Sequence, residues 1–417
     1  MARVDPKAVL AGRVPGRPPI GLMTGLAVTS ACALVALGLY AWSGGAAGFA
    51  VGVIMAVLPV PLLVSLVLLL DRLEPEPWRD LVFAFMWGAG VAVLGALILN
   101  TYGYEYLTQP RFGTEQGHFL TATVGAPVIE ESFKGAVLFG FLWFRRSEID
   151  NLTDGIIYAA MVALGFAMME NIAYYMKAFE AGGGHQLEAV FILRSVLAPF
   201  GHPLFTSMTG LGVAYAATGR RTVGRWLAPI GGLLAAMVLH GLWNGSTAFG
   251  YRGLLVVYLF DLGILAGLVG VVIWERRQTV RLIGTYLPRY GGTGLVSPLD
   301  VQMLGRLPAR KDARRWARRL GGSAAARDMA NYQLAATEVA LLHQRADRGL
   351  ADQGRFEQRQ RALLELMRDA LERFRRDAPP PRRPQVPPWT HGGPTAFRPP
   401  PPPMFEPPRP YGTSPSR

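Results

Sequence analysis

Long apolar runs constrain this chain more than any other feature of its sequence. Between Ile20 and Trp274 there are about eight runs of 20 or more mostly apolar residues. A bilayer core of roughly 30 Å is crossed by about 20 such residues in a helix, whose backbone polar groups are satisfied internally. The sequence therefore predicts an all-α fold, a polytopic transmembrane helix bundle with about eight spans.

The limits of the apolar runs define the expected spans. The first span contains Cys32, the single cysteine, which excludes an intrachain disulfide and any cluster of thiolate ligands. The basic N-terminus, residues 1–19, lies far from any small-residue cleavage site, so we expect no signal peptide and a retained first helix. We place the spans at residues 20–42, 46–70, 80–100, 119–144, 155–176, 189–217, 226–249 and 253–275.

The net charge of +13 is explained by the distribution of basic residues among the loops. Lys and Arg near helix ends mark the cytoplasmic side of a membrane protein. Four basic residues flank the spans on one side, namely Arg111, Lys177, Arg194 and Arg252. Fourteen flank them on the other, namely Arg3, Lys7, Arg13, Arg17, Arg72, Arg79, Arg145, Arg146, Arg220, Arg221, Arg225, Arg276, Arg277 and Arg281. We therefore expect a cell-membrane protein with both termini in the cytoplasm and no nucleic-acid partner.

The composition changes after residue 276, which divides the chain into four expected regions. The basic N-terminus (1–19) and the transmembrane domain (20–276) precede a cytoplasmic helical region (277–377) and a tail (378–417). The tail holds half of the 32 prolines, so it cannot bury a core and is expected to be disordered. A tether is its expected role, and docking of a cytoplasmic partner that binds polyproline is the alternative.

Two local signals indicate helix boundaries within residues 277–377. Ser297, followed by Pro298 and by Asp300 three residues later, is typical of a capped helix start. The pair Gly321-Gly322 separates a basic stretch from a long helical pattern that continues to about Arg376. A small helical hairpin is the structure that we expect.

Ionisable and amide side chains inside the apolar runs are the informative anomaly. A charged side chain near the bilayer centre costs on the order of 3 kcal/mol, and by default it faces a bundle interior or a wet cavity. By our boundaries these residues all lie between the midplane and the outer third of their helices, which predicts one shared site. The residues are Glu130, Glu131, Lys134, Glu170, Asn171, His202, His240 and Asn244.

Such a layer permits two kinds of hydrolytic chemistry. Of two adjacent carboxylates, one acquires a raised pKa and can act as a general base, while Lys134 holds the other ionised. Histidine and asparagine side chains can then stabilise an oxyanion. Alternatively, carboxylates and histidines can bind Zn²⁺ and leave a position for water, with Glu130, Glu170, His202 and His240 as the candidate ligands.

Each of these residues also has a structural alternative. Glu130 and Lys134, four residues apart on one helix face, could form only a neutralising ion pair. His202, between Pro199 and Pro203, could bond a carbonyl freed by a broken helix turn. Polar contacts between helices could account for His240 and Asn244. Jointly, these alternatives require several coincidences at one depth.

Four motifs in chain order resemble the PrsW family of bacterial intramembrane proteases. The segment from Asp71 to Pro77 also resembles the E-P-x-P signature of that family, and the resemblance covers about residues 50–250. The four motifs are E-E-x-x-K at Glu130, Glu131 and Lys134, G-F-A-x-x-E-N from Gly165 to Asn171, His202, and H-x-x-x-N at His240 and Asn244.

The resemblance implies an intramembrane endopeptidase, of the metallo- or the glutamate type, that acts on membrane-anchored proteins such as anti-sigma factors. The distantly similar CAAX-prenyl endopeptidases and Abi proteins imply that Glu130 activates water with help from a histidine. They also imply that His240 with Asn244 supports the oxyanion. Lys134 departs from the CAAX enzymes, which carry an arginine at a longer spacing.

Two other functional classes fit parts of the sequence. Intramembrane Glu, Lys and His also build proton and ion paths in transporters. Against a proton- or ion-coupled transporter, the sequence shows no inverted repeat, and its polar residues cluster at one depth. A non-catalytic membrane scaffold would act through the cytoplasmic helices and the tail.

Overall fold

The computed structural model describes residues 20–70, 76–219, 223–349 and 353–377. Helices are the regular elements of these residues, which contain no strand. The predicted all-α helix bundle is therefore confirmed. The expectations for the N-terminus (1–19) and for the Pro-rich tail (378–417) fall outside the described residues, as does most of the segment that resembles E-P-x-P.

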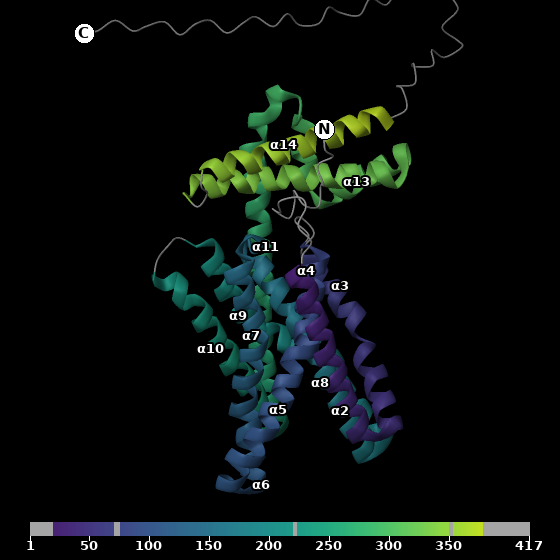
Figure 1. Ribbon diagram of the computed structural model, residues 1–417, viewed down its shortest axis with the longest axis vertical. Coiled ribbons are helices and arrows are strands. Elements are labelled where there is room, and N and C mark those ends of the chain that lie inside the picture. Colours follow the sequence, from purple (N-terminus) through teal and green to yellow (C-terminus); the bar gives the residue numbers. More distant parts are fainter. Residues whose placement is uncertain (1–19, 71–75, 220–222, 350–352, 378–417) are drawn as a thin grey trace, which may run out of the picture. The chain divides into compact units, whose positions relative to one another are not determined.

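Ten α-helices make up the apolar part of the described chain (Figure 1). Four π-helical segments join or extend them, at Gly88–Ala92, Tyr104–Thr108, Thr121–Gly125 and Ile192–Leu197 (η5). The α-helices are α2 (Ile20–Val57), α3 (Val60–Leu70), α4 (Trp78–Trp87), α5 (Val93–Gly103), α6 (Gln109–Leu120), α7 (Ala126–Phe144), α8 (Leu152–Phe191), α9 (Gly201–Thr218), α10 (Val223–Ser246) and α11 (Gly250–Tyr286).

Four stretches of the described residues are long and apolar enough to cross a membrane, namely Ile20–Leu70, Trp78–Phe144, Leu152–Thr218 and Val223–Thr293. Each exceeds the length of one span and contains a glycine with positive φ, at Gly45, Gly113, Gly183 and Gly250 respectively. This conformation interrupts a helix and suits glycine, which has no Cβ. Each interruption falls between two of the spans that the sequence predicts, so each stretch consists of two helical arms.

The arms of the second and third stretches run antiparallel. In the second, the Trp87 indole donates to the Phe133 carbonyl over 2.9 Å, and the Thr108 and Thr121 hydroxyls lie 2.8 Å apart. In the third, the hydroxyl oxygens of Tyr175 and Ser195 lie 2.5 Å apart across the two arms. Side chains of α4 and α5 therefore face α7, and side chains of α8 face those of η5 and α9.

Glycine contacts let α8 approach its neighbours closely. A Cβ on Gly155 of α8 would lie 2.3 Å from the Gly210 carbonyl oxygen of α9, and a Cβ on Gly210 would lie 2.2 Å from that of Gly155. Ala159 and Ala214 follow these glycines at the i+4 position and are fully buried. Small residues at this spacing are a common basis of close helix packing in membranes.

The N-terminus of α8 is fixed by side chains from two parts of the chain. Asn151 and Asp154 form a capping box, in which each side chain accepts from the backbone N–H of the other residue. The Glu275 carboxylate of α11 accepts from the backbone N–H groups of Leu152 and Thr153 at 2.8 and 2.7 Å. These bonds satisfy N–H groups that a helix start leaves unpaired.

The remaining α-helices form a second hydrophobic core together with the end of α11 and the segment that follows it. They are α12 (Pro298–Leu304), α13 (Leu307–Asp347) and α14 (Gln353–Asp377), and α14 packs along α13. A capping box at Ser297 and Asp300 begins α12, as the sequence predicts. Non-helical backbone at Gly321 and Gly322 interrupts α13 at the predicted place.

Substitution of Gly155 by valine is expected to destabilise the fold by about 1–3 kcal/mol, because the added atoms overlap the α9 backbone. Gly140→Val is the matched control, since a Cβ on Gly140 meets no atom within 4 Å. Thermal unfolding of both variants in detergent measures the difference. Equal midpoints for the two variants would contradict the role assigned to the α8–α9 contact.

Candidate functional site

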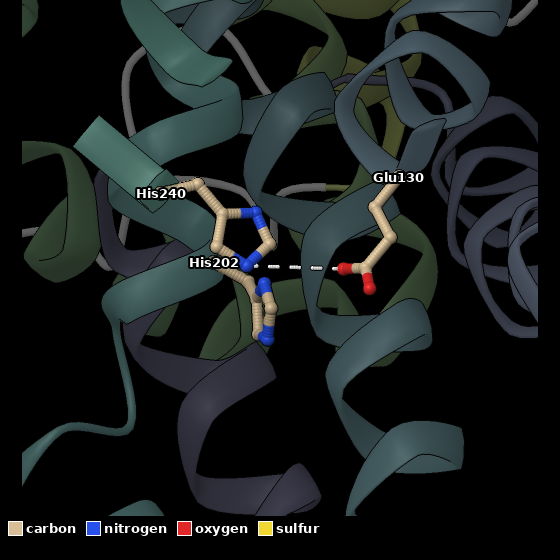
Figure 2. Close-up of side chains that lie close together, drawn as sticks. All are labelled: Glu130, His202 and His240. Carbon is tan, nitrogen blue, oxygen red and sulfur yellow. Dashed lines mark ion pairs between the residues drawn. The ribbon is translucent and has the colours of Figure 1, made fainter. Parts of the chain in front are cut away.

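Six of the eight predicted site residues form one connected cluster. Glu130, Glu131 and Lys134 come from α7, and Glu170 comes from α8. His202 comes from α9 and His240 from α10. Figure 2 shows the two imidazoles and the Glu130 carboxylate lying close together. The tertiary structure thus brings together ionisable groups from four helices.

Glu131 is the most heavily bonded carboxylate of the cluster. It is fully buried and accepts from Lys134 Nζ over 2.8 Å and from the Thr206 hydroxyl over 2.8 Å. Its Oε1 also lies 3.0 Å from His240 Nδ1. A carboxylate can only accept here, so Nδ1 of His240 carries the proton. The Nε2 atom of His240 is therefore left with a free lone pair.

Lys134 fixes the tautomer of the second histidine. Its ammonium lies 3.0 Å from His202 Nδ1 and 3.8 Å from the centre of the Phe166 ring. An ammonium only donates, so Nδ1 of His202 accepts and its Nε2 carries the proton. This Nε2 lies 2.9 Å from a Glu170 carboxylate oxygen. Each histidine is thus oriented by a carboxylate, Glu131 or Glu170.

Glu130 differs from Glu131 in having an unsatisfied oxygen. Its Oε1 accepts a long hydrogen bond of 3.4 Å from Asn100 of α5. Within the described residues, its buried Oε2 has no hydrogen-bond partner. Among the described residues, the basic groups within 4 Å of it are Lys134 Nζ at 3.6 Å and His240 Nε2 at 3.9 Å. Buried acceptors are nearly always satisfied, so this oxygen indicates a place for a water molecule or an ion.

Arg194 of η5 is a member of the cluster that the sequence analysis counted only among the basic residues flanking the spans. Its guanidinium pairs with Glu170, and its Nε donates to the Asn171 side-chain oxygen over 2.5 Å. It also lies over the Tyr174 ring, 3.8 Å from the centre. Arg194 is a charged residue inside an apolar run, the same signal that identified Glu170, and this signal could have found it.

Two predicted residues lie at the edge of the cluster. Asn171 contacts Arg194, and the Asn244 amide donates to the Ala122 carbonyl, in the π-helical segment Thr121–Gly125 that precedes α7, over 2.8 Å. Thr206 and Asn100, which bond the two adjacent glutamates, were not predicted. Uncharged polar residues are common in membrane helices and carry no distinguishing sequence signal.

A pocket adjoins the cluster between α2, α3, α8, η5, α9 and α10. It encloses about 780 Å³, including space open to its surroundings, and Glu170, Arg194, His202, His240 and Asn244 form its polar side. Glu130, Glu131 and Lys134 are not among its lining residues, whereas the two imidazoles that they contact are. Its apolar wall includes Val60, Leu63, Leu164, Met168, Phe205 and Trp243.

The residues present fit a divalent cation. Among the described residues, Glu130, His202 and His240 each offer one ligand atom, and these atoms lie within 4.8 Å of one another. Two imidazoles and one carboxylate are a known donor set for catalytic zinc, and carboxylates that orient the histidines are typical of such sites. Glu170, the fourth predicted ligand, contacts His202 and Arg194 instead.

Comparison with known proteins gives a consistent result. The family described as PrsW family intramembrane metalloprotease matches residues 76–274. Protease PrsW of Oceanobacillus iheyensis is 31% identical over 188 residues, which cover 45% of this chain and 78% of that protein. The same-named protein of Geobacillus kaustophilus is 30% identical over 190 residues, or 45% and 76% of the two chains.

A third relative, Protease PrsW of Bacillus subtilis, is 28% identical over 184 residues, which cover 44% of this chain and 76% of that protein. No solved structure matches this chain significantly. The matched region contains all the residues of the cluster. From its sequence matches, the chain belongs to the PrsW family and is an intramembrane protease of the bacterial membrane.

Proposed function

We propose that this protease cleaves membrane-anchored proteins, with anti-sigma factors as the expected class, by means of water activated at Glu130. The observation that carries the proposal is the buried Glu130 Oε2, which has no hydrogen-bond partner in the described chain. This oxygen can accept a proton from a water molecule, whose oxygen then attacks the peptide carbonyl carbon. The same carboxyl group can pass the proton to the departing amine nitrogen as the C–N bond breaks.

Glu131 supports this chemistry without taking part in proton transfer. Its contacts with Lys134, Thr206 and His240 all favour the ionised carboxylate. Glu131 therefore stays an acceptor that holds the His240 ring. The division of roles between Glu130 and Glu131 follows from their unequal sets of partners.

The tautomer of His240 favours a metal site over a purely acid–base site. With its proton on Nδ1, the Nε2 atom near Glu130 cannot donate to an oxyanion. A free lone pair at that position suits a metal ligand. As the alternative to proton transfer by Glu130, we propose that Glu130, His202 and His240 hold a divalent cation, with Zn²⁺ as the expected ion and Glu130 as a ligand instead of the base. When bound, the cation supplies a Lewis acid for the peptide carbonyl.

Lys134 sets a condition on metal binding. It donates to His202 Nδ1, the nitrogen that a cation would need. Binding through that nitrogen requires Lys134 to give up this hydrogen bond while it keeps the bond to Glu131. We propose that the ammonium and the cation compete for the same donors of the site.

The pocket offers a place for the substrate chain. Its apolar wall on α2 and α3 can receive apolar side chains, and its polar side can receive the peptide backbone. A scissile bond that lies along this side would approach His202 and His240. The proposed substrate is therefore an extended apolar segment at or near the end of a membrane anchor.

We also propose eight spans with both termini in the cytoplasm. The positive-φ glycines inside the four apolar stretches and the excess of basic residues at alternate helix ends support this topology. Alkaline phosphatase fused after residue 377 or in the 145–151 loop is expected to be inactive, because that enzyme matures only outside the cytoplasm. A fusion near Gly183 is expected to be active. The reverse pattern would overturn the orientation.

Replacement of Glu130 by glutamine is expected to abolish cleavage of a membrane-anchored substrate, because the amide keeps the shape of the side chain but cannot take a proton. Residual activity should lie at least 100-fold below that of the wild type. Glu115→Gln, at an exposed position, is the control and should leave the rate unchanged. Wild-type activity in Glu130→Gln with an unchanged unfolding midpoint would exclude Glu130 as the base.

Metal analysis of the purified protein tests the proposed cation site. We expect about one Zn²⁺ per chain, lost in His240→Ala and His202→Ala and retained in His185→Ala, whose histidine is exposed and outside the cluster. Zinc content is read by mass spectrometry and needs no activity assay. Full proteolytic activity in a metal-free preparation would leave the glutamate-activated water without a metal as the mechanism.

A further inference from the structure

The first part of α13 is strongly basic and has no role in the proposed chemistry. From Arg306 to Leu320 the chain contains seven basic residues and one acidic residue, Asp312. This segment lies outside residues 76–274, the part of the chain that matches the protease family. Its charge therefore needs an explanation other than catalysis.

The basic side chains lie on one face of the helix. Lys311, Arg315, Arg318 and Arg319 are exposed and follow the i, i+4, i+7, i+8 pattern of a single face, here named the basic face. On the opposite side of the helix, Ala317 is fully buried. Arg310, also buried, donates to the Leu304 carbonyl over 2.8 Å and to the Thr337 hydroxyl over 2.7 Å. The helix is thus held by one side and leaves the basic face open.

The basic face is poorly neutralised by the protein itself. Arg315 pairs with Asp312, whereas Lys311, Arg318 and Arg319 have no ion pair in the described part of the chain. By contrast, α14 contains seven basic and five acidic residues. Its arginines pair with carboxylates in Arg359–Glu338, Arg361–Glu357 and Arg373–Asp328. The first part of α13 therefore carries a larger unpaired excess of positive charge than α14.

Two contacts connect α13 to one end of the apolar bundle. Arg345 of α13 pairs with Asp150, in the loop that precedes α8. The Tyr286 hydroxyl, at the end of α11, donates to Asp347 over 2.6 Å. Because α11 continues without a break from its apolar part to Tyr286, the second arm of α13 is tethered to a membrane-embedded helix, and the Arg310–Thr337 bond holds the first arm against the second. An anionic partner that is always present there is the bilayer surface.

We propose that the basic face binds the headgroups of anionic phospholipids. Clusters of basic residues next to a membrane helix attract anionic lipids, and each residue strengthens the binding about fivefold. Trp316, 44% exposed beside the basic face, is an aromatic residue suited to the membrane–water interface. The assignment to the cytoplasmic leaflet rests on the topology proposed above, whereas the lipid contact itself does not.

Headgroup quenching in vesicles tests the contact with the full-length protein. A Cys32→Ser, Ser323→Cys variant carries one fluorophore just after the basic segment and is reconstituted with spin-labelled headgroups as quenchers. We expect stronger quenching in vesicles with about one-third phosphatidylglycerol than in pure phosphatidylcholine. The difference should disappear in about 1 M NaCl, where the Debye length is about 3 Å. This comparison at low and high salt uses the labelled protein without any substitution in the basic face.

A pair of matched triple variants localises the effect. Lys311→Gln, Arg318→Gln and Arg319→Gln together should lower lipid binding by about 100-fold and reduce quenching to the phosphatidylcholine level. The control triple, Arg361→Gln, Arg368→Gln and Arg376→Gln, removes three exposed charges from α14 and should retain the quenching. Quenching does not depend on proteolysis. The lipid proposal can therefore be contradicted or supported whatever the cleavage assay of Glu130→Gln shows.

Three results would overturn the proposal. Equal quenching of the wild type in both kinds of vesicle would show that the headgroup charge is irrelevant. Equal losses in the two triple variants would show that the basic face has no special role. Retention of nucleic acid by the detergent-solubilised wild type, without quenching that depends on phosphatidylglycerol, would assign the face to a different polyanion.

Discussion

The buried contact between Lys134 and Glu131 is the interaction on which the rest of the site depends. Both side chains are fully inaccessible, and the ammonium lies 2.8 Å from the carboxylate. Loss of one partner from such a pair typically costs about 3–5 kcal/mol, because the other charge stays buried alone. The pair also sets the protonation of two neighbours, since Glu131 holds the proton of His240 on Nδ1 and Lys134 holds that of His202 on Nε2. Glu130 is then left with the open oxygen.

Close packing of α8 makes these contacts possible. A Cβ on Gly165 would lie 2.0 Å from the Phe85 carbonyl oxygen of α4, and a Cβ on Gly88 would lie 1.9 Å from that of Val162. A side chain at either position would push the helices apart. The glycine of the G-F-A-x-x-E-N motif, Gly165, is thus explained by the close approach of α4. The phenylalanine of the motif, Phe166, is explained by its contact with Lys134. The motif combines packing residues with the carboxylate that orients His202.

The two sides of the histidine pair have different surroundings. On one side lie the buried glutamates and Lys134, where charges hold one another in place. On the other side lies a pocket whose walls are mostly apolar. An intramembrane protease needs both, because activation of water requires polar groups while its substrate arrives from an apolar phase. His202 and His240 contact both environments, and it is at these residues that we propose the substrate meets the catalytic groups.

The sequence alone determined the helical class, the positions of the helix breaks and six ionisable residues of the cluster, although not Arg194. Each of these rests on a local property, namely apolar run length, the freedom of glycine at positive φ, and the cost of a charge in an apolar run. Only the tertiary structure decided which groups meet. The helical spacing allows Lys134 to reach either Glu130 or Glu131. Glu131 accepts the short hydrogen bond from Lys134 because Thr206 and His240 hold its carboxylate in place. Likewise, Arg194 pairs with Glu170, and Asn100 bonds to Glu130, through contacts between different helices. A single sequence carries no periodic signal for such contacts.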